Sequence, residues 1–183
     1  EDLFEPQAVY GYFRCRKVDK NNLLVKYVDG ENKKNLELTF EFPRSSLEKH
    51  LCISDYFDTV SDDVVAFQAV TMGNRVAEVV EEWNKDNRYS DAYYLHGLAV
   101  ETAEALADWI NLRIKRDLKL DKGGLRYSWG YPSCPDVSQH YLVWKLLNPT
   151  PNGMSLTESG QINPEYSTAA IVVHHPDAEY FTL

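Results

Sequence analysis

The chain has 183 residues, of which 44% are hydrophobic and 26% charged, and its formal net charge is −9. This composition is ordinary for a folded domain and excludes a disordered or low-complexity chain. The acidic balance argues against nucleic acid or an anionic membrane surface as a partner, because phosphate groups are bound by clustered Lys and Arg side chains. No apolar run approaches the roughly 18 residues that a membrane span needs.

The cysteines and the N-terminus indicate the cellular compartment of the protein. Cys15, Cys52 and Cys134 are odd in number, far apart and in no Cys-x-x-Cys pair, so they indicate neither a disulfide framework nor a zinc site. The chain begins Glu-Asp-Leu-Phe, without an initiator Met and without the features of a signal peptide. We therefore expect a cytoplasmic location and a fragment or cleaved product of a longer chain.

Alternating apolar and polar residues predict strands in the first part of the chain. The pattern covers 9–15, 23–29 and 36–42, separated by turn signals at 19–22 and at Asp29-Gly30. Three such strands in sequence predict an antiparallel meander. An acidic loop at 54–63 leads to a more apolar run at 64–70, which predicts a buried fourth strand.

Two helices are expected next. Val76, Val79, Val80 and Trp83 share one helical face, and a break at Asp86-Asn87 separates them from a long helix at 90–118. The spacing of apolar residues predicts that one stripe of the long helix is packed: Leu95, Leu98, Ala99, Thr102, Leu106 and Trp109. A different face carries Val100, Glu104, Ala107, Asp108 and Asn111.

Glycines at 123 and 124 end this helix, and 125–135 follows, reading Leu-Arg-Tyr-Ser-Trp-Gly-Tyr-Pro-Ser-Cys-Pro. Two prolines and a glycine exclude a helix, and we predict a rigid loop. Asp136 is expected to cap a helix at 137–147, a strand is expected at 169–173, and 180–183 is a candidate last strand. The predicted fold class is α+β, a twisted antiparallel sheet with helices packed against it.

The 125–135 segment carries the strongest chemical signal. Arg126 offers a planar fork for a carboxylate, Gly130 lets a ligand approach the backbone, and Tyr127, Trp129 and Tyr131 offer flat faces. The alternative is a structural turn in which Arg126 pairs with a surface acid and the rings fill the core. Composition alone favours neither interpretation.

Several blocks, in the right order, resemble the C-terminal activation domain of cobalamin-dependent methionine synthase. The pattern Arg-x-x-x-Gly-Tyr-Pro-x-x-Pro begins at Arg126, and the other blocks are Leu95-His96-Gly97-Leu98, Ala103-Glu104-Ala105-Leu106-Ala107, Leu156-Thr157-Glu158-Ser159 and the stretch from His174 to Phe181. The resemblance implies that 1–183 is a single activation domain that binds S-adenosylmethionine (AdoMet). It also implies an upstream segment with a further acidic AdoMet contact, after which this chain starts.

The resemblance further implies a function. The domain would present the methyl group of AdoMet to cob(I)alamin during reductive reactivation of the synthase, a homocysteine methyltransferase that uses 5-methyltetrahydrofolate. Cobalamin would be held mainly by a partner domain, and the electron would come from a flavodoxin-like or reductase donor. Because the cofactor does the chemistry, no side-chain nucleophile or general base is expected in this domain.

The implied site residues follow by position. Glu104 aligns with an acid that binds AdoMet, and Arg126 aligns with the partner of the AdoMet carboxylate, a role that suits its fork. Tyr180 would form an aromatic wall. Ser128, Gly130 and Tyr131 align with backbone or close-approach positions. Many relatives have proline after the arginine and before the glycine, where this chain has Tyr127 and Trp129, and this departure bears most on Ser128.

Two other classes of function stay open from the sequence. The chain could be an AdoMet-independent docking module for a cobalamin-binding domain, or a binding protein for a small amino-acid ligand. No metal site is expected, since adjacent strand residues such as His174 and His175 point to opposite faces and are read as structural. No Ser-His-Asp arrangement, P-loop or dinucleotide motif is present.

Overall fold

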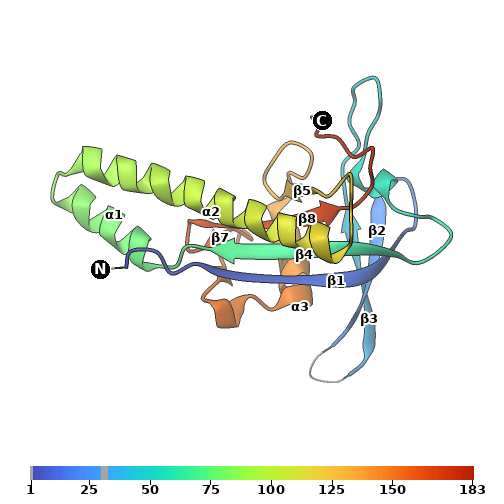
Figure 1. Ribbon diagram of the computed structural model, residues 1–183, viewed down its shortest axis with the longest axis horizontal. Coiled ribbons are helices and arrows are strands. Elements are labelled where there is room, and N and C mark those ends of the chain that lie inside the picture. Colours follow the sequence, from blue (N-terminus) through green and yellow to red (C-terminus); the bar gives the residue numbers. More distant parts are fainter. Residues whose placement is uncertain (1, 30–32) are drawn as a thin grey trace.

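The fold is built on one six-stranded antiparallel sheet (Figure 1). The computed structural model describes residues 2–29 and 33–183. The spatial order is β3 (Asn35–Glu41), β2 (Asn22–Val28), β1 (Gln7–Lys17), β4 (Asp63–Thr71), β8 (Ser167–Val173) and β5 (Leu125–Ser128). A second, two-stranded sheet pairs β6 (Ser155–Leu156) with β7 (Ile162–Asn163). The predicted α+β class, with an antiparallel sheet and packed helices, is confirmed.

The strands that alternation predicts all form. β1, β2 and β3 make the expected meander, with Cys15 opposite Val25 and Lys26 opposite Glu37. β4 pairs with the other edge of β1, so that β1 lies inside the sheet. The predicted turn at Asp29-Gly30 lies partly outside the described residues.

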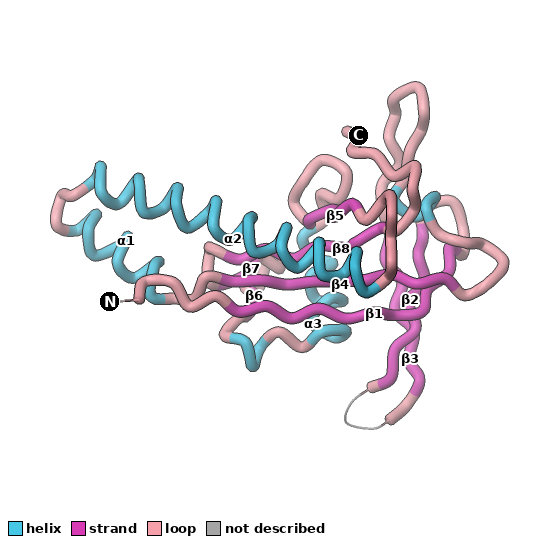
Figure 2. Tube along the Cα trace, viewed as in Figure 1, coloured by secondary structure: helices cyan, strands magenta, loops and turns pink. Residues whose placement is uncertain are grey.

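The sheet is covered on both faces, and β4 shows how the sequence divides them. Ala66 and Val70 pack with residues of α2 (Tyr89–Asp117). Phe67 and Ala69 point to the other face and join the largest core cluster, against which α3 (His140–Leu147) packs. α2 and α3 therefore lie on opposite faces of the sheet (Figures 1 and 2). The period-2 alternation of a strand produces this division directly.

α2 is the predicted long helix, but its packed stripe was predicted correctly only in part. Leu95 and Ala99 are buried as expected, whereas Ala107, which was placed on a different face, is buried as well. Leu98 is 55% exposed and Trp109 61% exposed. The residues that α2 buries are mostly small: Ala92, Leu95, Ala99, Ala103, Ala107, Ile110 and Ile114. Alanine lets a helix lie close to the sheet, and larger side chains would hold the two apart. Gln68 of β4 adds a bond at this contact, donating from Nε2 to the carbonyl of Ala107 at 3.2 Å.

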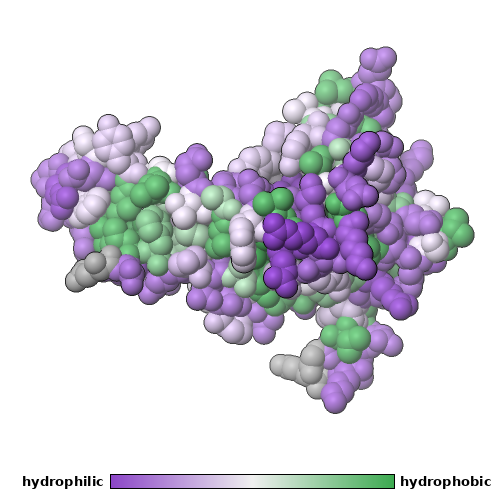
Figure 3. Space-filling view, in the orientation of Figure 1, coloured by the Kyte–Doolittle hydropathy of each residue, from purple (hydrophilic) through white to green (hydrophobic). Residues whose placement is uncertain are grey.

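The N-terminal part of α2 packs against α1 (Arg75–Lys85), which is the other predicted helix. The two helices form a hairpin that projects beyond the sheet beside the N-terminus (Figure 1). Val76 and Val79 are buried against α2 residues such as Ala99, as the sequence indicates. Apolar atoms are visible over this end of the molecule, whereas hydrophilic residues dominate the other end of the same view (Figure 3).

The structure corrects three predictions in the last third of the chain, and two of them concern the segments 125–135 and 137–147. The rigid loop predicted at 125–135 begins as a strand, β5, because its edge hydrogen-bonds to β8, with Arg126 opposite Val172. Only the part from Trp129 onward is a turn, closed by a bridge between Tyr131 and Cys134. The helix predicted at 137–147 is a short 3-10 turn, Val137–Gln139, followed by α3. Asp136 caps that turn by accepting from the backbone N–H of Ser138, as expected.

The candidate last strand at 180–183 does not form. The backbone carbonyls of this tail bond to side chains instead of to a neighbouring strand. Tyr127 Oη donates to the carbonyl of Glu179 at 2.7 Å, and Ser133 Oγ donates to that of Phe181. Ser45 Oγ donates to the carbonyl of Thr182 at 2.6 Å. The tail is thus held across the end of β5 by side chains from three other segments.

In the described part of the chain, no helix is long and apolar enough to cross a membrane. Cys15, Cys52 and Cys134 are buried and free in the structure.

Candidate ligand-binding cleft

A cleft of about 720 Å³ lies between α2, β5 and its turn, the loop that contains residues 45–51, and the C-terminal tail. Its size falls in the usual range for small-molecule sites. Five of the six site residues expected from the sequence line it: Glu104, Arg126, Ser128, Tyr131 and Tyr180. The structure therefore brings together, in one cleft, residues that are up to 76 positions apart in the chain.

Arg126 is the centre of the polar contacts in the cleft. Its side chain is 12% exposed. Nε donates to Asp108 Oδ1 at 2.8 Å, Nη1 donates to Ser128 Oγ at 3.1 Å, and Nη2 donates to Glu104 Oε2. Both carboxylates come from the same face of α2, one turn apart, as their i, i+4 spacing requires. The close packing of the alanine face on the sheet brings them within reach of β5.

This arrangement joins two interpretations that the sequence left open. Arg126 is paired with acids, as the structural reading expected, and it also lines a cleft, as the ligand-binding reading expected. Burial lowers the pKa of Arg126, but the hydrogen bonds and charges of Glu104 and Asp108 outweigh burial and hold that pKa above its usual value. The guanidinium is a permanent cation, and two carboxylates against one cation leave the site with a surplus negative charge.

Two tyrosines stand at the cleft with exposed rings. Tyr131 is 56% exposed and Tyr180 65% exposed. Tyr127, whose ring is buried, supports Tyr180 edge-on at 5.4 Å between ring centroids. Burial raises the pKa of Tyr180, Arg126 lowers it, and Asp108 and Glu104 raise it, so the net shift is upward. This ring therefore stays a neutral hydroxyl-bearing surface at physiological pH.

Gly130 and Trp129 differ from what the sequence suggested. Gly130 does not line the cleft, and a Cβ at its position would touch only Val137 Cγ1, at 3.5 Å. Gly130 has a φ of 91°, a backbone angle that favours glycine, so the residue is required by its backbone conformation and not by close approach of a ligand. Trp129 is buried and packs against Phe40 and Phe67 in the core, so it offers no face to the cleft. A part for Gly130 in ligand binding stays a prediction.

One wall of the cleft had no signal in the sequence. Ser45, Leu47, Glu48, Lys49 and Leu51 line it from a loop that follows β3. Lys49 Nζ pairs with Glu179 Oε1 of the tail at 2.5 Å, which closes the loop onto the opposite wall. No motif marks these residues, since only the folded chain brings them beside Arg126. Asp108, which pairs with Arg126, was not among the expected site residues either, although the helical spacing placed it on the same face as Glu104.

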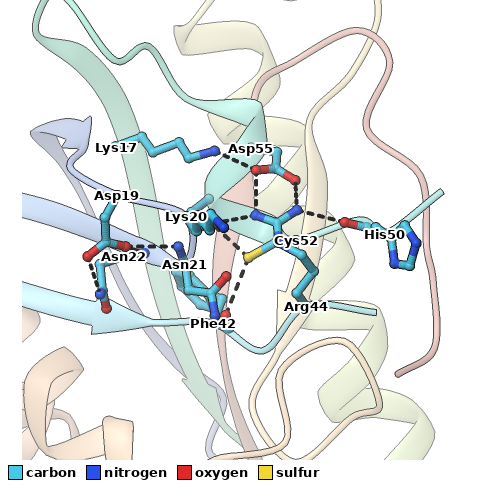
Figure 4. Close-up of polar contacts among 11 residues, drawn as sticks. Lys17, Asp19, Lys20, Asn21, Asn22, Phe42, Arg44, His50, Cys52 and Asp55 are labelled. Carbon is cyan, nitrogen blue, oxygen red and sulfur yellow. Dashed lines mark hydrogen bonds and ion pairs between the residues drawn. The ribbon is translucent and has the colours of Figure 1, made fainter. Parts of the chain in front are cut away.

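This wall loop is anchored at its base by a cluster of charges (Figure 4). Arg44 donates to both carboxylate oxygens of Asp55, at 2.5 and 2.9 Å, and to the carbonyl of His50 at 2.6 Å. Lys17 Nζ lies 2.5 Å from Asp55 Oδ1. Burial raises the pKa of Asp55, but these hydrogen bonds and charges outweigh burial and leave that pKa below its usual value. The paired fork holds both ends of the loop together.

The histidines that invited a metal reading have other partners. His174 Nε2 lies 2.7 Å from Asp63 Oδ1, and His175 Nδ1 accepts from the backbone N–H of Asp177 at 3.2 Å. A further histidine, His140, bonds through Nδ1 to the carbonyl of Gly160 at 2.7 Å. Burial lowers the pKa of His140, which favours the neutral ring. Across residues 2–29 and 33–183, no group of three or more His, Cys, Asp and Glu side chains is placed to hold a metal ion.

Chemically, the cleft suits a zwitterionic or cationic ligand. Arg126 can bind a carboxylate, Glu104 can bind an ammonium or another cationic centre, and the two tyrosines can cover a flat ring. The side chains that line it include no cysteine and no histidine. These groups can bind and orient a ligand.

Comparison with known proteins agrees with this picture. A family model described as "Vitamin B12 dependent methionine synthase, activation domain" matches residues 1–183. The methionine synthase of Mycobacterium tuberculosis (strain ATCC 25618 / H37Rv) is 33% identical over 208 residues, which cover 99% of this chain and 17% of that protein. The methionine synthase of Mycobacterium leprae (strain TN) is 34% identical over 203 residues, which cover 96% and 17%. The chain thus spans about one sixth of the length of these relatives.

A solved structure of the MetH reactivation domain bound to AdoHcy superposes with a TM-score of 0.83 over 98% of this chain and 62% of that one. Its sequence identity is 23%, so the match bears on the fold. The family model covers the whole chain. The chain belongs to the family of vitamin B12-dependent methionine synthase activation domains.

Proposed function

We propose that this domain binds AdoMet in the cleft around Arg126 and presents its methyl group to cobalamin during reductive reactivation of methionine synthase. The observation that carries the proposal is the pairing of Arg126 with Glu104 at the wall of a cleft of about 720 Å³. Family membership supports it, as does the AdoHcy bound to the related reactivation domain. AdoHcy is what AdoMet becomes when it has lost its methyl group.

The proposed roles follow from charge and shape. The α-carboxylate of AdoMet would bind the Arg126 guanidinium, whose planar fork fits two carboxylate oxygens. The α-ammonium or the sulfonium would lie near Glu104. Tyr131 and Tyr180 would cover the adenine, Ser128 would keep Arg126 in place, and the Gly130 turn would set the position of Tyr131. The surplus negative charge of the free site favours AdoMet, which carries one net positive charge, over a neutral zwitterion.

The domain itself would contribute orientation. Holding the methyl group at a fixed place converts an encounter between two molecules into a step within one complex. Cobalamin, held by another domain, would supply the nucleophile after reduction by a flavodoxin-like or reductase donor. That nucleophile would accept the methyl group, the electron pair of the broken C–S bond would stay on sulfur, and AdoHcy would remain in the cleft. The partner domain, the electron donor and a cytoplasmic location remain predictions.

Calorimetric titration with AdoMet tests the proposal. We expect saturable binding that Arg126→Ala and Glu104→Ala each weaken by at least about tenfold, the effect of losing a charge-assisted hydrogen bond. Arg113→Ala is the matched control, since Arg113 is an exposed cation on α2 that pairs with Asp117 outside the cleft. Absence of AdoMet binding to the folded wild type, or equal binding by all four proteins, would contradict the proposal.

A further inference from the structure

We propose that Asp108 is a positioning residue that sets the orientation of the Arg126 guanidinium, and that it thereby gives the cleft its preference for ligands that carry a carboxylate. The inference rests on the proposed function, because it assumes that Arg126 binds the ligand carboxylate. It adds a residue that does not itself touch the ligand.

The two acids on α2 contact Arg126 from different places. Glu104 lines the cleft, and its side chain is 33% exposed. Asp108 does not line the cleft, and its side chain is 69% exposed. A ligand that enters the cleft therefore meets Glu104 and competes with it for Arg126. The Asp108 contact lies outside that path and persists when a ligand is bound.

The hydrogen bonds that Arg126 donates support this difference between Glu104 and Asp108. An arginine side chain has five N–H groups. Asp108 takes the one on Nε, Ser128 takes one on Nη1, and Glu104 takes one on Nη2. In the described part of the chain, this leaves one N–H on each Nη nitrogen for a ligand. Because the guanidinium is planar and rigid, the bond at Nε fixes the plane in which these remaining N–H groups lie.

Without Asp108, only the contacts at the Nη nitrogens would hold the guanidinium. Glu104 is an anion, so it would draw the freed guanidinium toward itself more strongly than the Ser128 hydroxyl would. The N–H groups that would bind the ligand carboxylate would then turn toward Glu104. Asp108 therefore prevents the guanidinium of Arg126 from turning toward Glu104. This predicts a selective loss of affinity for the carboxylate part of the ligand.

The experiment compares two ligands on four proteins. AdoMet and decarboxylated AdoMet are titrated calorimetrically into the wild type, Asp108→Ala, Asp108→Asn and Glu101→Ala. The measured quantity is the ratio of the two dissociation constants. Asn removes the charge of Asp108 but keeps an oxygen that can accept from Nε. Glu101 is an exposed acid on the same helix that does not line the cleft, so Glu101→Ala matches the charge change.

We expect Asp108→Ala to lower the preference for AdoMet over its decarboxylated form about tenfold, the scale of one charge-assisted hydrogen bond. Asp108→Asn and Glu101→Ala should keep a ratio close to that of the wild type. Equal weakening of both ligands by Asp108→Ala would overturn the inference, because it would mean a general effect on charge or structure. A ratio lowered equally by Asn and Ala would also overturn it, since charge would then matter rather than the bond at Nε.

The design separates this inference from the proposed function. If the wild type binds neither ligand, the proposed function itself fails. If the wild type binds AdoMet and the Asp108→Ala ratio stays unchanged, only the inference fails. Thermal unfolding of each variant checks that the fold is retained, which we expect because Asp108 is exposed.

Discussion

The two faces of the central sheet are packed by opposite means. On the α2 face, the helix packs through small residues such as Ala107, which lies in one cluster with Ala66 and Val70 of β4 and lets the helix approach closely. On the other face, large rings such as Phe40, Phe67 and Trp129 pack against one another, with centroids 5.0 to 6.1 Å apart. The two faces therefore have different structural roles. The aromatic face supplies most of the apolar burial, and the alanine face sets the distance between helix and sheet on which the cleft depends.

β5 connects the two faces. Its alternation sends Arg126 and Ser128 to the α2 side, opposite Val172 and Ala170 of β8, and it sends Tyr127 into the main core, where Trp129 of the following turn also packs. The residues that face the cleft are thus held on a strand whose other side is anchored by rings. A site on a strand supported in this way is positioned more accurately than one on a free loop.

The largest effect is expected on the aromatic face. Phe67→Ala should lower the free energy of unfolding by about 3 to 5 kcal/mol, because a fully buried ring is removed and a cavity is left behind. Urea unfolding followed by circular dichroism measures the change. A loss below about 1 kcal/mol would mean that the core collapses around the gap, and it would contradict the rigid packing that we infer.

A mutation on the alanine face should cost less stability but damage the cleft more. Ala107→Leu overpacks the contact between α2 and the sheet, and we expect a cost of about 1 to 3 kcal/mol. Because α2 must move away, Glu104 and Asp108 should lose reach to Arg126, and AdoMet affinity should fall in titration. Ala105→Leu is the matched control, since Ala105 is exposed on the same helix. Equal AdoMet affinity of the two variants would refute the spacing role of the alanines.

The charge cluster below the wall loop predicts a pH dependence. The pKa of Asp55 lies below its usual value of 3.8 in the folded protein, so its ion pairs contribute stability above pH 3.8 and lose it as the pH falls further. The contribution is about 1 kcal/mol, because the pairs are partly exposed. Thermal unfolding at pH 6 and pH 3 should therefore show a smaller acid loss for Asp55→Asn than for the wild type. Identical losses would show that the cluster does not stabilise the fold.

The smallest effect tests the corrected stripe of α2. Leu98→Gln should change the free energy of unfolding by no more than about 0.5 kcal/mol, because Leu98 points to solvent. Ala103→Gln, at a buried position outside the predicted stripe, should cost well above 1 kcal/mol, since it forces a larger polar group into the buried face. Chemical denaturation of the two variants decides between the two stripes. The opposite ranking would restore the stripe predicted from the sequence.

Much of the fold could be predicted because its signals are local. Strand alternation at 9–15 and 36–42, and the helical spacing of Val76 and Val79, depend only on neighbouring residues. The stripe of α2 could be predicted only in part. Leu95 and Ala99 are buried as expected, but hydrophobicity also favours Leu98 and Trp109, which are exposed, whereas the packing selects alanines. β5 was missed for a similar reason, since its strand depends on pairing with β8, which lies about 40 residues later.

The same distinction holds for the cleft. The antiparallel α+β class, the family and five residues that line the cleft could be predicted from the sequence, because motifs and periodicity depend on residues that are close in the chain. The folded structure was needed to show that Asp108 meets Arg126, that the loop with Lys49 forms a wall, and that the tail is no strand. These contacts join segments that are distant in the chain, and their formation depends on how closely α2 packs on the sheet.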